Sequence, residues 1–483
     1  MYKVCLKLTA LVSLLIVCNV AIALPFESFD PRSMAMGGTG VAVGDPSTAP
    51  FFNPAMLTAS DPSKKYSFEF PIIGARLYDP SDMHNNLKSL SDNINTLSLS
   101  LDAVNAASGN TATPATIQQL PGNMNTLAGN IDKVNSSLAA LSNQPLQGVF
   151  GLATVVGIPG KNWGFAFYAD AWGAVGGTLE YNDHQTLFDL STSVKSASTS
   201  LSSGAVACAA VQAGGAGATQ ANVQACLGAG DTLVNNKGTV NFSTSTGITS
   251  KIHVRGVAVE EAGLSISHNL VTSDHSWSLG VTPKVMNLQL FDALLAANNG
   301  TNTSNATGND YLAKYNTVNF DMGVAKSYNN GWRTGVVVKN VIPQSFDFKR
   351  APNPGDTPIA IGSKLNMNPQ GRLGISHENA WSTVAFDLDL AKNNPAGLES
   401  KSQYAGLGGE LSAWGWAQLR AGYRSDLVNK GQDLISLGFG LSPRIPYFKP
   451  HLDLAVTSSR DVLSNGWNNA TQAGASLKLG FNF

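Results

Sequence analysis

The chain has 483 residues, a formal net charge of −1 and only 13% charged residues. A near-neutral chain lacks the basic excess with which proteins hold nucleic acid, so we expect no nucleic-acid partner. Beyond the first residues, no segment holds the ~18 consecutive apolar residues of a membrane-spanning helix. A chain of this kind can still enter a membrane as a closed barrel of strands.

Residues 1–23 are typical of a secretory signal peptide. Two lysines flank the start of an apolar run, and residues 21–23, Ala-Ile-Ala, form a small-x-small cleavage pattern. The run is too short to serve as a membrane anchor. A lipid-anchored start at Cys18 is disfavoured, because the bulky Val17 stands where a small residue is needed. We therefore predict an exported protein whose mature chain begins at Leu24.

Residues 24–65 form a leader that we predict to be a hatch or plug. It contains the run Met-Gly-Gly-x-Gly-x-Ala and, further on, Asn-Pro-Ala. Glycines let a backbone pack closely, and a proline fixes a turn after an asparagine that can cap nearby backbone groups. Two interpretations stay open: a movable plug in a lumen, or a leader that only ties the terminus to the barrel wall. The motif residues are Gly37, Gly38, Gly40, Asn53, Pro54 and Ala55.

From residue 66 onward, runs of about ten residues alternate apolar and polar positions, which predicts strands with one lipid-facing and one water-facing side. In one run, Val384, Phe386 and Leu388 share a face, and Asp387 and Asp389 share the other. A single run is typical of a soluble sandwich, but repetition to the last residue favours an all-β transmembrane barrel, antiparallel, with about 14 strands. The predicted strands lie near residues 66–78, 147–158, 163–182, 254–271, 276–290, 316–327, 332–342, 361–378, 381–391, 403–413, 415–426, 433–442, 450–459 and 471–483.

Two long insertions interrupt this pattern within the predicted barrel, residues 66–483. Residues 84–143 carry two runs of apolar residues spaced by three and four, which predicts an extracellular, coiled-coil-like helical hairpin. The hairpin either buries its own two stripes or binds a protein partner. Residues 183–253 are rich in serine, alanine and glycine and hold Cys208 and Cys226, the only thiols left after signal removal. In an oxidising compartment we expect this pair to form a disulfide that staples a partly helical surface loop.

The last predicted strand ends on an aromatic residue, as does the recognition signal of bacterial barrel assembly. We therefore expect the barrel-assembly machinery to bind this end. The residues of this terminal pattern are Leu477, Leu479, Phe481 and Phe483.

The seven histidines are scattered over separate predicted elements. No nucleophile elbow, phosphate loop or metal-ligand spacing accompanies them. We therefore expect no catalytic activity, no cofactor and no metal.

The glycine run followed by Asn-Pro-Ala resembles the N-terminal hatch of the FadL-type outer-membrane channels for hydrophobic compounds. The helical insertion after the first strand and the overall length are most similar to the conjugal-transfer TraF-like outer-membrane family. The resemblance covers the hatch closely, the barrel in pattern and the insertions loosely.

This resemblance implies a place in the outer membrane of a Gram-negative-type bacterium, in contact with lipid and lipopolysaccharide. It implies a passive, porin-like channel for small hydrophobic molecules, with a hatch that shifts to open a path. The alternative is a structural or partner-binding protein of conjugal transfer, whose helical hairpin engages another protein. Fold alone does not decide between the two.

Overall fold

The computed structural model describes residues 28–43, 45–59, 66–108, 114–202, 219, 221, 249–271, 276–296, 311–349, 364–394, 397–398, 400–412, 415–443, 449–466 and 470–482. The predicted signal peptide, Cys208, Cys226 and Phe483 lie outside these residues. Within the described ranges, no helix combines the length and the apolar character needed to cross a membrane.

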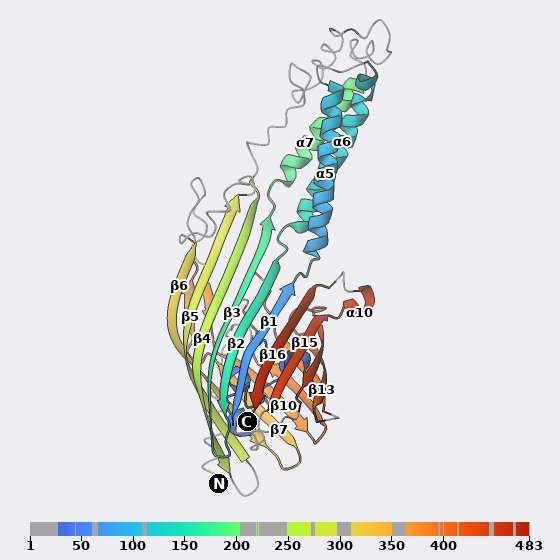
Figure 1. The fold of residues 1–483 in the computed structure, drawn as a ribbon. Helices are drawn as coiled ribbons and strands as arrows, with labels where there is room; N and C mark the ends of the chain where they lie inside the picture. The colour runs from blue at the N-terminus through green and yellow to red at the C-terminus, as the bar shows by residue number, and fades with distance from the viewer. Residues whose placement is uncertain are drawn as a thin grey trace.

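The strands form one closed antiparallel barrel of 14 strands, which confirms the predicted fold class (Figure 1). The first and last strands pair along almost their whole length and close the barrel. Apart from this closure and the pairing of β7 with β10, each strand pairs with its neighbours in sequence. The barrel strands are β1 Ser67–Tyr78, β2 Leu146–Ile158, β3 Trp163–Glu180, β4 Lys251–Val271, β5 Ser276–Ala296, β6 Leu312–Ser327, β7 Trp332–Lys339, β10 Gln370–Glu378, β11 Ser382–Asp389, β12 Tyr404–Leu411, β13 Ala417–Asp426, β14 Leu434–Leu441, β15 Lys449–Ser459 and β16 Gln472–Asn482.

The predicted strand over 361–378 was wrong in its first part. β9 (Lys364–Met367) pairs with β8 (Gln344–Asp347) in a separate two-stranded sheet, and only β10 belongs to the barrel. The physical reason is burial: Phe346, Leu365 and Met367 join a hydrophobic cluster with inward side chains of β4 and β5. The hairpin therefore buries its apolar residues against β4 and β5, and it does not form a strand of the barrel wall.

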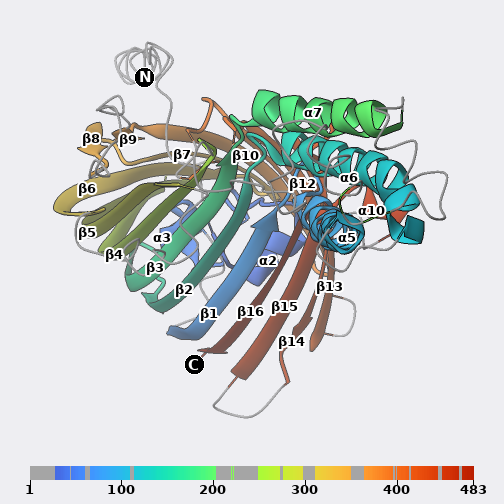
Figure 2. The ribbon, with the colours of Figure 1, turned by 90° about the horizontal axis from the view of Figure 1, so that it is seen from above.

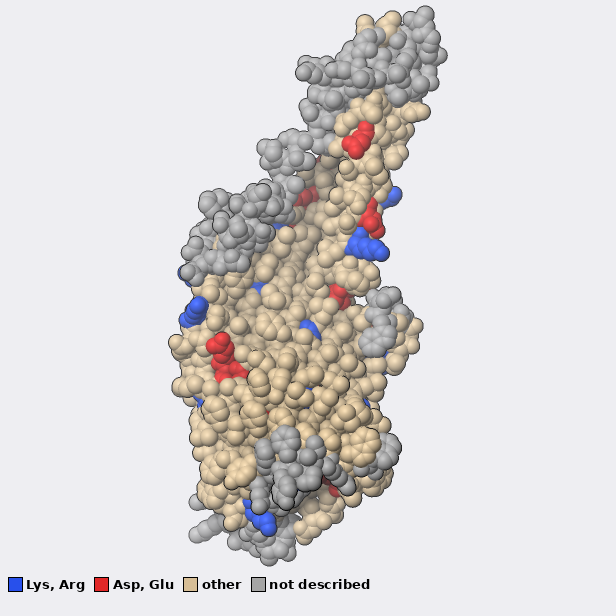
Figure 3. Space-filling view, viewed as in Figure 1, with Lys and Arg blue, Asp and Glu red and all other residues tan. Residues whose placement is uncertain are grey.

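The two faces of the wall differ as the alternation predicts. On β11, Val384 is 53% exposed whereas Asp387 and Asp389 are buried. The tryptophans Trp163 and Trp381, at the end with short turns, are also more than half exposed, as in an interfacial aromatic girdle. The face of the barrel seen in Figure 3 carries few charged side chains. The outer face therefore suits lipid, and charge is gathered inside.

Three helices form an arm at the end of the barrel opposite the C-terminal end of β16: α5 (Met83–Ser108), α6 (Pro114–Leu141) and α7 (His184–Ser202). The sequence predicted the hairpin of α5 and α6 and a partly helical second insertion, but not that α7 of this insertion packs on α6, so that α6 lies in the middle (Figures 1 and 2). The seam of α6 is accordingly buried, whereas Leu87 and Ile94 of α5 remain 43% and 49% exposed. A one-turn helix, α10 (Val462–Asn465), lies between β15 and β16.

Candidate functional site

The N-terminal residues 28–43 and 45–59, here called the plug segment, lie inside the barrel (Figure 2). They form three short helices, α2 (Pro31–Ala35), α3 (Ala49–Phe52) and α4 (Met56–Ala59). Asp30 caps α2 by accepting a hydrogen bond from the Ser33 backbone N–H at 2.9 Å, and a proline occupies the first turn of α2 and α3. Helix α2 lies against β13 to β16 and α4 against β3 to β6, so the segment crosses the lumen.

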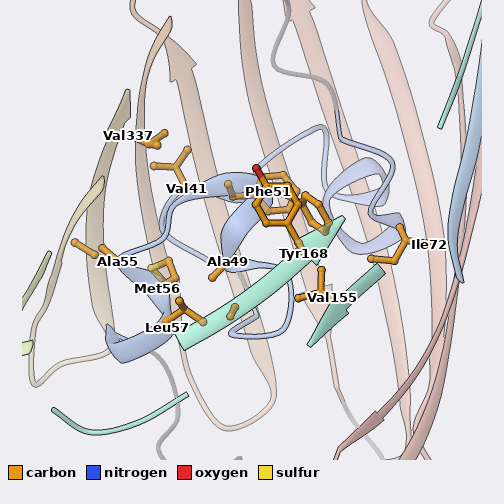
Figure 4. Close-up of a cluster of buried hydrophobic side chains, with 13 residues drawn as sticks. Val41, Ala49, Phe51, Ala55, Met56, Leu57, Ile72, Val155, Tyr168 and Val337 are labelled. Carbon is orange, nitrogen blue, oxygen red and sulfur yellow. The ribbon is translucent and has the colours of Figure 1, made fainter. Parts of the chain in front are cut away.

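An apolar cluster holds the second half of the plug segment against the wall (Figure 4). Phe51 packs edge-on against Tyr168 of β3, with ring centroids 5.4 Å apart. Met56 and Leu57 are at most 1% exposed within the same cluster. Full burial of such side chains contributes about 1.5–3 kcal/mol each, so the cluster is a strong attachment.

Asn53 connects two parts of the plug segment to the wall. Its Nδ2 donates to the carbonyls of Val41 at 3.0 Å and of Val324 on β6 at 3.2 Å, and its Oδ1 accepts from the Ala55 N–H at 3.1 Å. The glycine run is held in a similar way by Asp387 of β11. One of its carboxylate oxygens accepts the N–H groups of Gly40 at 2.8 Å and of Val41.

Small residues line the wall where the plug segment touches it. At Gly280 an added Cβ would lie 2.4 Å from the Ala55 nitrogen, and at Gly422 it would lie 2.1 Å from the Gly37 nitrogen. Every barrel strand therefore needs a small residue where it touches the plug segment, so that the two backbones can approach this closely. We call these small residues the ring. The glycines that meet the plug segment in this way are Gly74, Gly151, Gly164, Gly280, Gly323, Gly335, Gly374, Gly406, Gly408, Gly422 and Gly438. On the four other strands, the contacts come from Ser267, Ala385, Ala455 and Ser476.

A chain of alternating charges, here called the latch, fixes α2 to β12 to β16, on the side of the barrel opposite the apolar cluster. The Arg32 guanidinium makes two hydrogen bonds of 2.9 Å with the carboxylate of Glu410. The Lys478 ammonium contacts Asp30 at 2.9 Å. Burial alone would lower the pKa of Arg32, but Glu410 raises it above its ordinary value, so Arg32 stays charged. The latch consists of Asp30, Arg32, Glu410, Arg420, Asp453 and Lys478.

Polar cavities lie on both sides of α2. At the end with the short turns, a cavity of about 250 Å³ is lined by Arg32, Glu410 and Lys478 together with Asp45. On the other side, a space of only about 40 Å³ lies beside Gly37 and Gly38, next to several arginines. In this closed arrangement the plug segment separates the two spaces.

A groove of about 760 Å³ runs along β1 to β6. Its outward lining is mostly apolar, with Phe70, Leu152, Val285 and Val318 47–59% exposed. Ala153 lines this groove and also packs against the apolar cluster of the plug segment. Beside it, the pairing of β1 shifts register between Glu69 and Ile72. The groove and the plug segment are thus separated only by the wall at this irregularity.

The motif residues predicted from the sequence all lie in the plug segment: Gly37 and Gly38 beside β12 and β13, Gly40 on Asp387, and residues 53–55 against β5 and β6. Leu477, Leu479 and Phe481 lie on the outward side of β16. Sequence reasoning missed the ring of small residues and the latch. A small residue recurring at one inward position of every strand is the signal that indicates the ring.

Among the described residues, one group has the spacing of a metal site, Asp79, Asp82 and His84. The Asp79 carboxylate already accepts the N–H groups of Met83 and His84, at 2.6 and 3.1 Å. This arrangement is that of a cap at the start of α5.

A family model described as "F plasmid transfer operon, TraF, protein" matches residues 50–389. No curated protein matches the chain. Among solved structures, the chain is similar to the toluene transporter TbuX of Ralstonia pickettii, with 14% identity, a TM-score of 0.45, and coverage of 95% of this chain and 98% of that one. The toluene transporter TodX of P. putida has 12% identity, a TM-score of 0.41 and coverage of 95% and 98%. A FadL homologue of Pseudomonas aeruginosa has 10% identity, a TM-score of 0.44 and coverage of 96% and 99%.

Proposed function

This chain belongs to the family described as "F plasmid transfer operon, TraF, protein", and we propose that it is an outer-membrane passive channel for small hydrophobic molecules, FadL-like in kind and gated by the plug segment. Its surroundings would then be outer-membrane lipid and lipopolysaccharide. The apolar outer face and the charged interior of a closed barrel support this location.

The observation that carries the proposal is the apolar groove beside the plug segment. A site for small apolar molecules needs a largely apolar space of ~300 Å³ or more, and the groove exceeds this at about 760 Å³. Through Ala153 it meets the cluster that seats α3 and α4. A shift of these helices would expose apolar surface to the lumen directly behind the groove.

The proposal is tested by locking the plug segment to the wall. The hydroxyls of Thr58 on α4 and Ser267 on β4 lie 2.6 Å apart, so cysteines at both positions are placed to form a disulfide. We would measure the uptake of N-phenylnaphthylamine, an apolar fluorescent dye, into cells that make the Thr58→Cys/Ser267→Cys protein. Oxidation should lower dye uptake to that of cells without the protein, and dithiothreitol should restore it.

The controls are the unsubstituted protein and the single Thr58→Cys variant, both oxidised and reduced in the same way. They should show the same uptake in both states, because neither can form the lock. If the locked double variant admits dye as fast as the reduced one, the plug segment is not the gate. If no variant admits more dye than cells without the protein, the channel function itself is refuted.

The arm favours a second candidate function, a structural or partner-binding role in conjugal transfer. Three helices stand away from the barrel (Figure 1), and the apolar stripe of α5 is only partly covered by α6. Replacing residues 83–141 by a short turn should then abolish plasmid transfer between cells and leave dye uptake unchanged. Loss of dye uptake with normal transfer would assign the arm to the channel instead.

A further inference from the structure

The groove on the outer face of β1 to β6 has a defined height in the membrane. On β4, outward residues run from Leu270, at the end with the short turns, to Glu260. That distance is roughly 33 Å along the strand, or ~25 Å along the membrane normal at a tilt of ~40°, which equals the height of the apolar band of such barrels. Glu260 therefore marks the outer edge of the band, level in register with Asn287 and Asn316.

The polar lining of the groove is one-sided in charge. Among the described residues that line it, Asp170, Glu260 and Glu261 are acidic and none is basic. Glu261 is paired with Lys284 on the inner side of the wall, at 3.0 Å. Asp170 is the register partner of Glu261 and faces the inner side as well, so Glu260, which is exposed on the outer face, is the acidic side chain that faces the groove.

This combination selects among molecules with an apolar tail. A carboxylate at the rim of the groove favours a head group that carries positive charge and donates hydrogen bonds. The same carboxylate repels a fatty-acid carboxylate and the phosphates of lipopolysaccharide. The floor beside Glu260 is made of small residues, Ala169, Ala171 and Ala262, which leave room for an alkyl chain.

We propose that this groove is a binding site for cationic amphiphiles, long-chain alkylamines in particular, and that it excludes fatty acids. As a statement about what crosses the membrane, this rests on the proposed channel function; as a statement about binding, it stands on the groove alone. The ammonium contacts Glu260, and the alkyl chain lies between Leu152 and Val285.

The test is equilibrium binding, so that it does not depend on transport. The full-length barrel in a neutral detergent would be titrated with dodecylamine, dodecanol and dodecanoate at pH 7, and bound molecules counted by native mass spectrometry. An alkylammonium is protonated at this pH, as the lysine ammonium is, and the carboxylate is ionised. Dodecylamine should bind about three- to fivefold more tightly than dodecanol, the range of a partly exposed ion pair, and dodecanoate more weakly than either.

Matched variants decide what causes the preference. Glu260→Gln should reduce dodecylamine binding to the level of dodecanol and leave dodecanol unchanged. Glu180→Gln, which removes the same charge outside the groove, should change neither. Ala262→Phe should weaken all binding by filling the floor.

Equal binding of all three probes, or an amine preference that survives Glu260→Gln, would overturn the proposal. Equal losses in Glu260→Gln and Glu180→Gln would also overturn it, because the preference would then reflect overall charge. A barrel that binds dodecylamine as expected but admits no dye would refute the channel and leave the binding site in place. Dye uptake without amine binding would do the reverse.

Discussion

Removing the positive charge of Lys478 should open the barrel. The side chains of Lys478 and Asp30 are each only 3% exposed, so Lys478→Met leaves the carboxylate of Asp30 buried without its ionic partner. Asp453 keeps its ion pair with Arg420, so the substitution mainly removes the attachment of the plug segment. Breaking a buried pair by removing one partner costs about 3–5 kcal/mol. Asp30 becomes hydrated when the plug segment leaves its seat, so this cost destabilises the closed state alone.

A cost of that size changes the ratio of open to closed barrels by roughly 10²- to 4 × 10³-fold. We would measure the open probability of single channels in planar bilayers. Lys478→Met should open far more often than the unsubstituted protein, and the additional substitution Asp30→Asn should close it again, because asparagine still caps α2 but carries no charge. Lys326→Met is the matched control, since Lys326 lies over the rings of Trp277 and Tyr328 instead of the plug segment. Equal open probabilities for the two lysine variants, at equal folded fractions, would refute the latch.

Three further predictions concern the ring, the loop anchor and the arm. Gly422→Leu on β13 should raise conductance, since even its Cβ would lie 2.1 Å from the Gly37 nitrogen, whereas Gly409→Leu on the neighbouring β12 should not, because its nearest neighbour is 3.9 Å away. Burial alone would raise the pKa of Asp183, but hydrogen bonds from Ser250 and Thr249 lower it below its ordinary value. Its contribution to stability is therefore complete above a pH of about 4 and is lost as the pH falls through the lowered pKa, so amide exchange at residues 249–250 should accelerate only in acid. In the Asp183→Asn variant, the amides of residues 249–250 should already exchange fast at pH 7. Unchanged exchange in this variant would refute the role of Asp183 in holding these residues. Leu127→Ala should destabilise the arm by about 2–5 kcal/mol, because Leu127 is 1% exposed, and calorimetry should show the barrel transition unmoved.

The barrel could be predicted from the sequence because its rule is local. Each strand alternates between lipid and lumen, so Val384 and Asp387 reveal their faces within a few residues. The β8–β9 hairpin could not be predicted in this way. Phe346 and Leu365 find their partners on β4 and β5, far away in the sequence, and a short apolar strand has the same local pattern wherever it packs. The packing of α7 on α6 could not be predicted for the same reason, since it depends on contacts between two separate insertions.

The candidate site was predictable in its motif but not in its attachments. Gly40 and Asn53 stand out by residue type, because glycine and asparagine serve close packing and backbone capping. The partner of Gly40, Asp387, is a lumen-facing aspartate like several others, and nothing local distinguishes it. The latch likewise joins Arg32 to Glu410 across most of the chain, so it exists only once the barrel is closed.

The attachments of the plug segment indicate the direction in which it can move. Its second half is held by apolar contacts on β1 to β7, and its first half by buried ion pairs on β12 to β16. Water weakens ion pairs far more than apolar contacts, and the cavity of about 250 Å³ brings the latch next to polar space at the end with the short turns. On the opposite side of α2 the space is only about 40 Å³. The first half should therefore release before the second, by swinging α2 toward the short turns about the cluster around Phe51. Such a motion leaves α3 and α4 seated longest, next to the wall at Ala153, where the groove approaches the lumen.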